Sequence, residues 1–145
     1  MEFVSNIERI AHPVGTVYNV LSDLSRLPAK EMDTEQGHVA VTPVDRDSCT
    51  IQASVVQVTL RITERQENKS VKLEAESSPI PATLWIQLLP DKEAEGVCHL
   101  RLTVRSDANP FMAGMIRKPL EKGVGKLAQM LASLPYDRIS NLPTD

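Results

Sequence analysis

The three histidines are the side chains best suited to acid–base chemistry near neutral pH, and they lie far apart in the sequence. His12 precedes Pro13, His38 opens an alternating apolar stretch, and His99 occupies the polar phase of another. Catalysis needs such a group to converge with a second one, as a base does with a nucleophile. No such constellation is visible around these histidines. We therefore expect each of them to have a surface or capping role, and we predict no catalytic residue.

Two pairs of arginines could instead bind a carboxylate. Arg61 and Arg65 share one phase of an alternating stretch, and Arg101 and Arg105 share one phase of another. A guanidinium group holds a carboxylate through two parallel hydrogen bonds, so either pair could orient an acidic ligand if its strand face lined a cavity. The opposite phase is apolar in both stretches, which favours the alternative, a solvated outer face.

The sequence lacks the motifs on which the common metal, nucleotide and serine-hydrolase mechanisms depend. Cys49 and Cys98 stand alone, without CxxC spacing, and we expect them to be small buried hydrophobic residues. The sequence contains no HExxH, no glycine-rich phosphate loop and no GxSxG. We predict neither a metal site nor a cofactor.

The composition is that of an ordinary globular chain. Of 145 residues, 41% are hydrophobic and 24% charged, and the net charge of −3 gives no general attraction to nucleic acid. No stretch approaches the roughly 18 apolar residues of a membrane span, and the first residues lack the layout of a signal peptide. We expect one cytoplasmic domain over residues 1–145, with a loosely ordered tail from about residue 137. The sequence does not indicate the oligomeric state.

The stretches that must position these side chains are mostly strands. Residues 2–11 mix apolar and polar residues and predict a first strand that ends at His12-Pro13. From Pro13 the apolar residues recur at spacings of three and four, which predicts one short helix or two before about residue 31. The further predicted strands cover residues 38–44, 49–55, 58–62, 71–76, 83–89 and 98–105. Residues 83–89 are almost continuously apolar, which predicts a strand covered on both faces.

A long amphipathic helix closes the pattern. Asn109 can cap it, Pro110 suits its first turn, and Pro135 follows its last apolar turn. Pro119 should kink it. The apolar stripe consists of Met112, Ile116, Leu120, Leu127, Met130, Leu131 and Leu134. Basic side chains that we expect on the solvent side, where they could meet an acidic partner, are Arg117, Lys118, Lys122 and Lys126.

Short turns between strands predict antiparallel neighbours, and helices at the two ends of an antiparallel run predict an α+β fold. The expected architecture is a helix-grip fold, a curved antiparallel sheet of about seven strands wrapped around the long C-terminal helix, with short helices after the first strand. The element order and the segments 10–24, 84–88, 109–131 and 118–120 resemble the START-like superfamily, also called SRPBCC. Its members include polyketide cyclases, lipid-transfer domains, plant pathogenesis-related allergens and small bacterial proteins of unassigned function.

The resemblance implies a cavity between sheet and helix that holds an apolar or amphipathic ligand. The residues expected to line it are Trp85, Phe111, Met112, Met115, Ile116 and Leu120. The alternative is that these side chains simply fill the core. With one Trp, two Tyr and two Phe, the chain has few groups to stack on a flat polycyclic ligand, a departure from the aromatic polyketide cyclases.

Three functions are compatible with the expected fold. The leading hypothesis is non-catalytic binding of a small hydrophobic or amphipathic molecule. One alternative is a cyclase- or dehydratase-like enzyme that uses polar groups in the same cavity. The other is a protein-interaction domain without ligand, as in family members that regulate chaperone ATPases.

Overall fold

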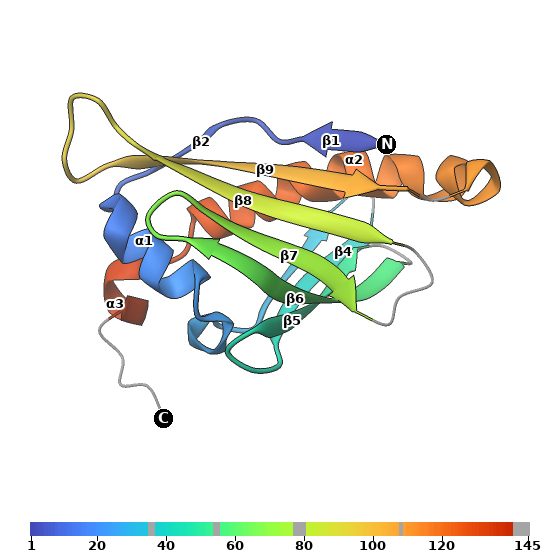
Figure 1. The fold of residues 1–145 in the computed structure, drawn as a ribbon, viewed down its shortest axis with the longest axis horizontal. Coiled ribbons are helices and arrows are strands. Elements are labelled where there is room, and N and C mark those ends of the chain that lie inside the picture. Colours follow the sequence, from blue (N-terminus) through green and yellow to red (C-terminus); the bar gives the residue numbers. More distant parts are fainter. Residues whose placement is uncertain (35–36, 54–55, 77–80, 108, 141–145) are drawn as a thin grey trace.

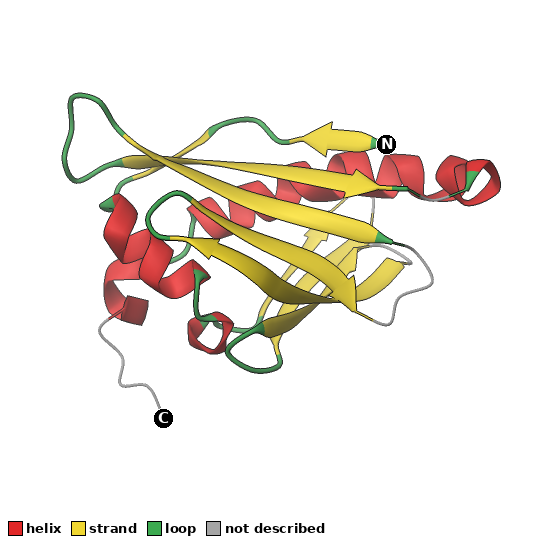
Figure 2. Cartoon of the chain, in the orientation of Figure 1, coloured by secondary structure: helices red, strands yellow, loops and turns green. Residues whose placement is uncertain are grey.

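The computed structural model describes residues 1–34, 37–53, 56–76, 81–107 and 109–140. Figures 1 and 2 show strands curling around one long helix, with the shorter helices gathered at one end. In chain order the elements are β1 (Glu2–Val4), β2 (Glu8–Ile10), α1 (Val14–Leu21), η1 (Leu24–Arg26), β3 (Lys30–Thr34), β4 (Gly37–Pro43), β5 (Ser48–Ala53), β6 (Val56–Gln66), β7 (Ser70–Glu76), β8 (Ala82–Pro90), β9 (Cys98–Ser106), α2 (Pro110–Ala132) and α3 (Tyr136–Ser140).

The strands form a nine-stranded sheet in the order β1-β9-β8-β7-β6-β5-β4-β3, with β2 also paired to β9. All the pairings are antiparallel. The curl brings α2 against β1, β2 and β9 on one side and β4 and β5 on the other, and buried side chains of the sheet and of α2 form one hydrophobic cluster. The predicted α+β helix-grip architecture is confirmed.

Two features raise the number of strands above the expected seven. The predicted first strand is interrupted at Ser5, whose hydroxyl oxygen accepts a hydrogen bond from the Leu102 amide at 2.9 Å. The chain therefore pairs with β9 as two short strands, β1 and β2. Strand β3 was not predicted, because its sequence, KEMDT, has no apolar alternation. It lies at the end of the sheet order and pairs with β4 alone.

Strand β8 is buried on one face only, so the prediction of cover on both faces was wrong. Leu84, Ile86 and Leu88 are buried, whereas Trp85 is half-buried and Leu89 is 61% exposed. The apolar residues of the second phase lie on the outer, convex face of the sheet. This difference decides where Trp85 points.

Helix α2 has two unlike halves. Its start is capped as predicted, since Oδ1 of Asn109 accepts a hydrogen bond from the Met112 amide at 2.9 Å. From Val124 onward its apolar stripe is buried, whereas in its first ten residues Ile116 alone is buried. Figure 1 shows why: the first turns of α2 extend past the end of the sheet. The second half thus anchors the helix.

The chain beyond α2 differs from the expected loose tail. Residues 136–140 form α3, which packs against α1. Tyr136 is fully buried and donates a hydrogen bond to the Leu131 carbonyl at 2.5 Å, and Ile139 is also buried. The periodicity of five residues was too short to predict this helix. Residues 141–145 lie outside the described part of the chain.

Candidate functional site

A cavity lies between α2 and the inner face of the sheet, as the resemblance implied. Its volume is about 80 Å³. The side chains and backbone that line it come from β4, β5, β6, the start of β8, β9 and the middle of α2: Val39, Ile51, Val58, Leu60, Ala82, Thr83, Leu84, Val104, Pro119, Leu120, Gly123, Val124 and Leu127.

Strand register brings these apolar residues together. Ile51 lies opposite Val58 across the β5–β6 hairpin, and Leu84 lies opposite Val104 across the β8–β9 hairpin. Because side chains on one face of a strand recur every second residue, each strand contributes its inward phase. The curl of the sheet then places both pairs against α2, with Leu120 of the helix in the same lining.

The lining allows little chemistry. Of the described residues that border it, Thr83 alone has a polar side chain and none is ionisable. Thr83 shares the outward phase of β8 with Trp85, so its hydroxyl points away from the cavity. A charged group in such surroundings would lose its hydration without a compensating partner. The cavity therefore suits an uncharged apolar molecule and offers no general acid or base.

The structure does not bring the six predicted lining residues together. Leu120 lines the cavity and Ile116 is buried in α2. Met112 is half-buried, whereas Phe111 is 81% and Met115 67% exposed. Sequence periodicity places these residues on faces of a helix but does not reveal where the helix passes the end of the sheet.

Trp85, the sixth predicted residue, lies on the face of β8 opposite the cavity. The Nζ atom of Lys72 lies 5.9 Å from the centroid of its ring, which indicates a cation–π contact on the convex surface. The strand residues of the lining, such as Val58, were missed, although their alternation in the sequence already indicated an inward phase.

Neither arginine pair faces the cavity, which agrees with the solvated alternative. Arg61 pairs with Glu76 at 3.3 Å. Arg65 contacts Asp47 at 2.6 Å, and its Nε donates to the Ser22 carbonyl at 2.9 Å. The expected common face of Arg61 and Arg65 is broken by a register shift between Ile62 and Glu64.

In the other pair, Arg101 donates from Nε to Oε1 of Gln87 at 3.0 Å, and Arg105 is exposed. Gln87 also accepts from the Thr103 hydroxyl at 3.0 Å, so its amide oxygen is shared between two neighbours on β9. These contacts tie the convex side of β8 to β9.

The histidines have separate local partners. Nδ1 of His38 lies 2.7 Å from Oδ1 of Asp33, and this contact raises the pKa of His38. Nε2 of His99 lies 2.8 Å from Oδ1 of Asp91, at the surface. His12 packs edge-on against the Tyr136 ring, with centroids 6.0 Å apart.

The two cysteines are buried and free, as expected, and burial raises the pKa of both thiols to about 11. A thiol is nucleophilic as its thiolate, so this environment makes both side chains inert packing groups. Within the described ranges, no group of three or more His, Cys, Asp and Glu side chains is placed to hold a metal ion.

Comparisons with known proteins bear on the fold. No protein-family model matches the sequence, and comparison with curated proteins finds no significant match. Among solved structures, a Thermobifida fusca protein matches at a TM-score of 0.57 with 14% identity, over 99% of this chain and 97% of its own. A Thermus thermophilus protein matches at 0.54 with 15% identity, over 96% of this chain and 97% of its own. Norcoclaurine synthase from Thalictrum flavum matches at 0.57 with 14% identity, over 97% of this chain and 85% of its own.

These likenesses and the topology agree on a helix-grip fold, in which an antiparallel sheet curls around a long C-terminal helix. At such identities the agreement concerns the fold. Within the part of the chain that the structure describes, no helix is long and apolar enough to cross a membrane.

Proposed function

We propose that this protein binds a small, uncharged, hydrophobic molecule in the cavity between α2 and the sheet, without chemical conversion. The observation that carries the proposal is the lining, where apolar side chains from five strands and from α2 converge. Removing apolar surface of a ligand from water supplies roughly 25 cal/mol per Å².

The cavity must enlarge to take a ligand. Its volume of about 80 Å³ is below the roughly 300 to 1,000 Å³ of drug-sized sites. The part of the lining best suited to move is α2 around Pro119, since proline has no N–H to donate to the Met115 carbonyl one turn earlier. Outward movement of the weakly packed first half of α2 would open the cavity while the second half stays anchored.

The cyclase- or dehydratase-like alternative receives less support from the same lining. Such a reaction needs an acid or base within hydrogen-bonding reach of the substrate. No described residue of the lining has an ionisable side chain, so the lining supplies neither group. Binding without catalysis is therefore the function that we infer.

Filling the cavity tests the proposal. Val58→Phe adds a ring at a half-buried position of the lining, where the empty volume can receive it. We expect the wild-type protein to bind n-octanol or naphthalene, detected as shifts of methyl resonances during an NMR titration. We expect Val58→Phe to lower that affinity at least about tenfold, a change of about 1.4 kcal/mol in binding free energy.

The matched control is Val44→Phe, the same substitution at a position that is 61% exposed and outside the cavity. It should bind both probes as the wild type does. A wild-type protein whose methyl resonances ignore both probes would contradict the proposal, as would a Val58→Phe variant that binds them unchanged and is folded by the same spectra.

A further inference from the structure

The outward face of α2 carries a second feature, a line of two large apolar side chains followed by two lysines. Phe111, Met115, Lys118 and Lys122 are spaced by four, three and four residues, so they lie on one side of the helix. We call these four residues the α2 face. Phe111 is 81% and Met115 67% exposed, and both lysines are exposed.

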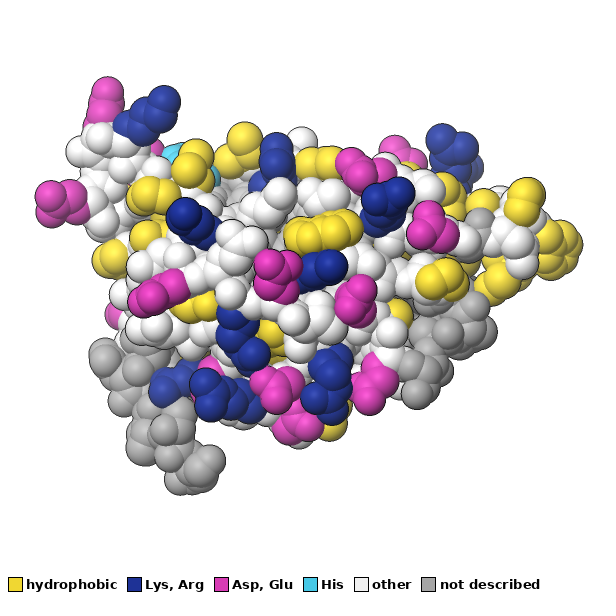
Figure 3. Space-filling view, in the orientation of Figure 1, with side chains coloured by type: hydrophobic (Ala, Val, Ile, Leu, Met, Phe, Trp, Pro, Cys, Tyr) yellow, Lys and Arg dark blue, Asp and Glu magenta, His cyan; other side chains and the backbone are white. Residues whose placement is uncertain are grey.

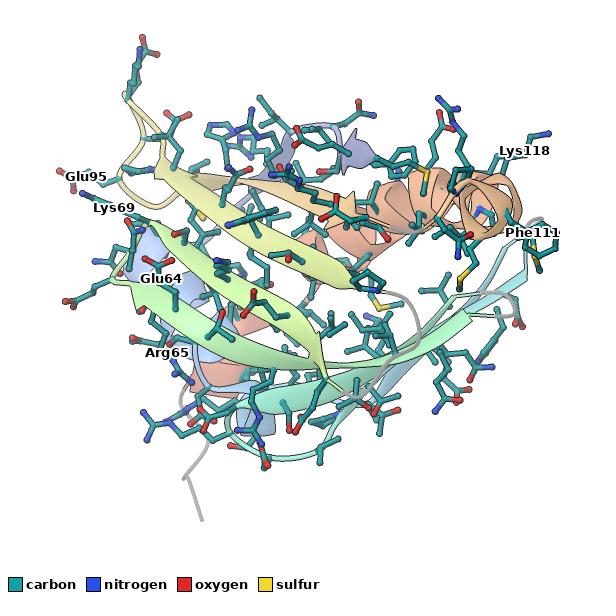
Figure 4. All side chains as sticks on the ribbon, turned by 45° about the vertical axis from the view of Figure 1, so that its right-hand side comes forward. Glu64, Arg65, Lys69, Glu95, Phe111 and Lys118 are labelled. Atoms are coloured by element: carbon teal, nitrogen blue, oxygen red, sulfur yellow. The ribbon has the colours of Figure 1, made fainter. Side chains whose placement is uncertain are left out.

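The figures show where this face lies. Figure 4 shows Phe111 and Lys118 on the first turns of α2, with both side chains directed away from the body of the molecule. Figure 3 shows hydrophobic side chains gathered at that same end of the molecule. The feature is therefore an exposed apolar edge on a protruding element, which usually marks an interaction site.

The charge of α2 is opposite to that of the whole chain. The helix contains four basic residues and one acidic residue, whereas the chain carries a net charge of −3. Among the described residues, no carboxylate forms an ion pair with Lys118 or Lys122. These two cations are therefore available to an anionic partner.

We propose that the α2 face docks on an anionic lipid bilayer. Apolar side chains that enter the boundary between headgroups and acyl chains, beside lysines that meet lipid phosphates, are the recognised features of a helix lying on a membrane surface. Phe111 and Met115 supply the first feature, and Lys118 and Lys122 supply the second.

Two other occupants fit less well. The α2 face of a second copy would add two more lysines and no carboxylate, so a two-fold dimer through this face would gather four cations without an anionic partner. A folded protein partner typically covers about 800 Å² with complementary shape. The α2 face is instead a convex edge with two large apolar side chains, which a deformable bilayer surface can surround.

Vesicle co-sedimentation of the full-length protein tests this proposal. We expect binding to vesicles of phosphatidylcholine and phosphatidylglycerol in equal amounts, weakened by added salt, and at least about tenfold weaker binding to phosphatidylcholine alone. The double variant Phe111→Ala, Met115→Ala should lower the partition coefficient at least about tenfold. The double variant Lys118→Gln, Lys122→Gln should lower it by about thirtyfold, at about 1 kcal/mol for each lysine.

Matched controls lie elsewhere on the surface. Val44→Ala with Leu89→Ala removes two apolar side chains that are each 61% exposed, and Lys69→Gln with Lys92→Gln removes two exposed lysines. Both controls should bind vesicles as the wild type does. The proposal is overturned if the wild type does not sediment with the anionic vesicles, which would leave the face to a protein partner, or if the α2 variants and the controls weaken binding equally.

This docking is separate from the proposed cavity function, and the two can fail independently. Val58→Phe should lose octanol binding but keep vesicle binding, because its side chain lies at the cavity and not on the α2 face.

Discussion

At the scale of single residues, Asp91 and His99 form a carboxylate–imidazole contact of the kind found in active sites, but here its role is structural. One carboxylate oxygen of Asp91 lies 2.8 Å from the His99 ring. The other accepts the backbone amides of Glu93 and Ala94, at 3.0 and 2.9 Å. Both oxygens are thus used in holding the connection between β8 and β9. Since the pair lies on the surface, away from the cavity, we interpret it as a clasp for this hairpin.

The clasp predicts a pH dependence of stability. The hydrogen bonds from His99, Glu93 and Ala94 lower the pKa of Asp91 from 3.8 to about 2. A group whose pKa is lowered by folding stabilises the folded state above its unfolded pKa, and this contribution disappears as the pH falls from about 4 to about 2. Asp91→Asn should therefore lower Tm by a few degrees at neutral pH and converge with the wild type near pH 2, as calorimetry at several pH values would show.

Asp107→Asn, at an exposed residue just beyond β9, is the control and should leave Tm unchanged at neutral pH. A constant difference in Tm between Asp91→Asn and the wild type across the acid range would contradict the assignment of this effect to the Asp91 carboxylate.

At the scale of elements, α2 divides at Pro119 into an anchored half and a projecting half. Val124, Leu127 and Leu131 bury the second half in the core. Ile116 alone is buried in the turns before Pro119. Local opening is least costly where few apolar contacts must be broken. This division supports both proposals. The first half of α2 is able to move away from the cavity to admit a ligand, and the same half exposes the α2 face to a membrane.

Replacing the proline tests this division. Pro119→Ala supplies the missing N–H and removes a penalty of about 3 kcal/mol for proline inside a helix, while it loses part of the packing of the ring. We expect a net rise of about 1 to 2 kcal/mol in the free energy of unfolding, measured by urea denaturation. We also expect slower hydrogen exchange in residues 113–118.

Pro28→Ala provides the comparison, because Pro28 is exposed and lies outside the helices. It should lower the free energy of unfolding by roughly 0.4 to 1 kcal/mol, since proline restricts the unfolded chain. If Pro119→Ala were destabilising, or left exchange in the first half of α2 unchanged, Pro119 would not be the weak point of the helix.

At the scale of the whole molecule, the fold was largely predictable and the cavity lining was not. Alternation in β7 and β9, and the capping of α2 by Asn109, are local signals, and both led to the correct elements. Strand β3 has no such signal, because an edge strand without apolar alternation is stabilised by its pairing with β4. The resemblance to START-like proteins supplied the arrangement of layers that local signals lack.

The lining depends on distances between layers, which periodicity does not contain. Phe111 and Met115 were chosen as bulky residues of the helix, but α2 extends past the sheet before it reaches the cavity. Trp85 stands in a run that is apolar in both phases, so the sequence did not distinguish its face. Leu120, chosen on the same ground as Phe111 and Met115, lies beside Pro119 at the part of α2 that borders the cavity.

The position of a bound molecule tests the central claim most directly. In isotope-filtered NOE spectra of the protein saturated with n-octanol, the account predicts contacts from the octanol chain to the methyl groups of Leu84, Val104 and Leu127 in the cavity. Contacts confined to Ile7 and Leu89, which border a shallow depression on the convex face, would contradict it. So would a saturated sample without intermolecular contacts in the cavity.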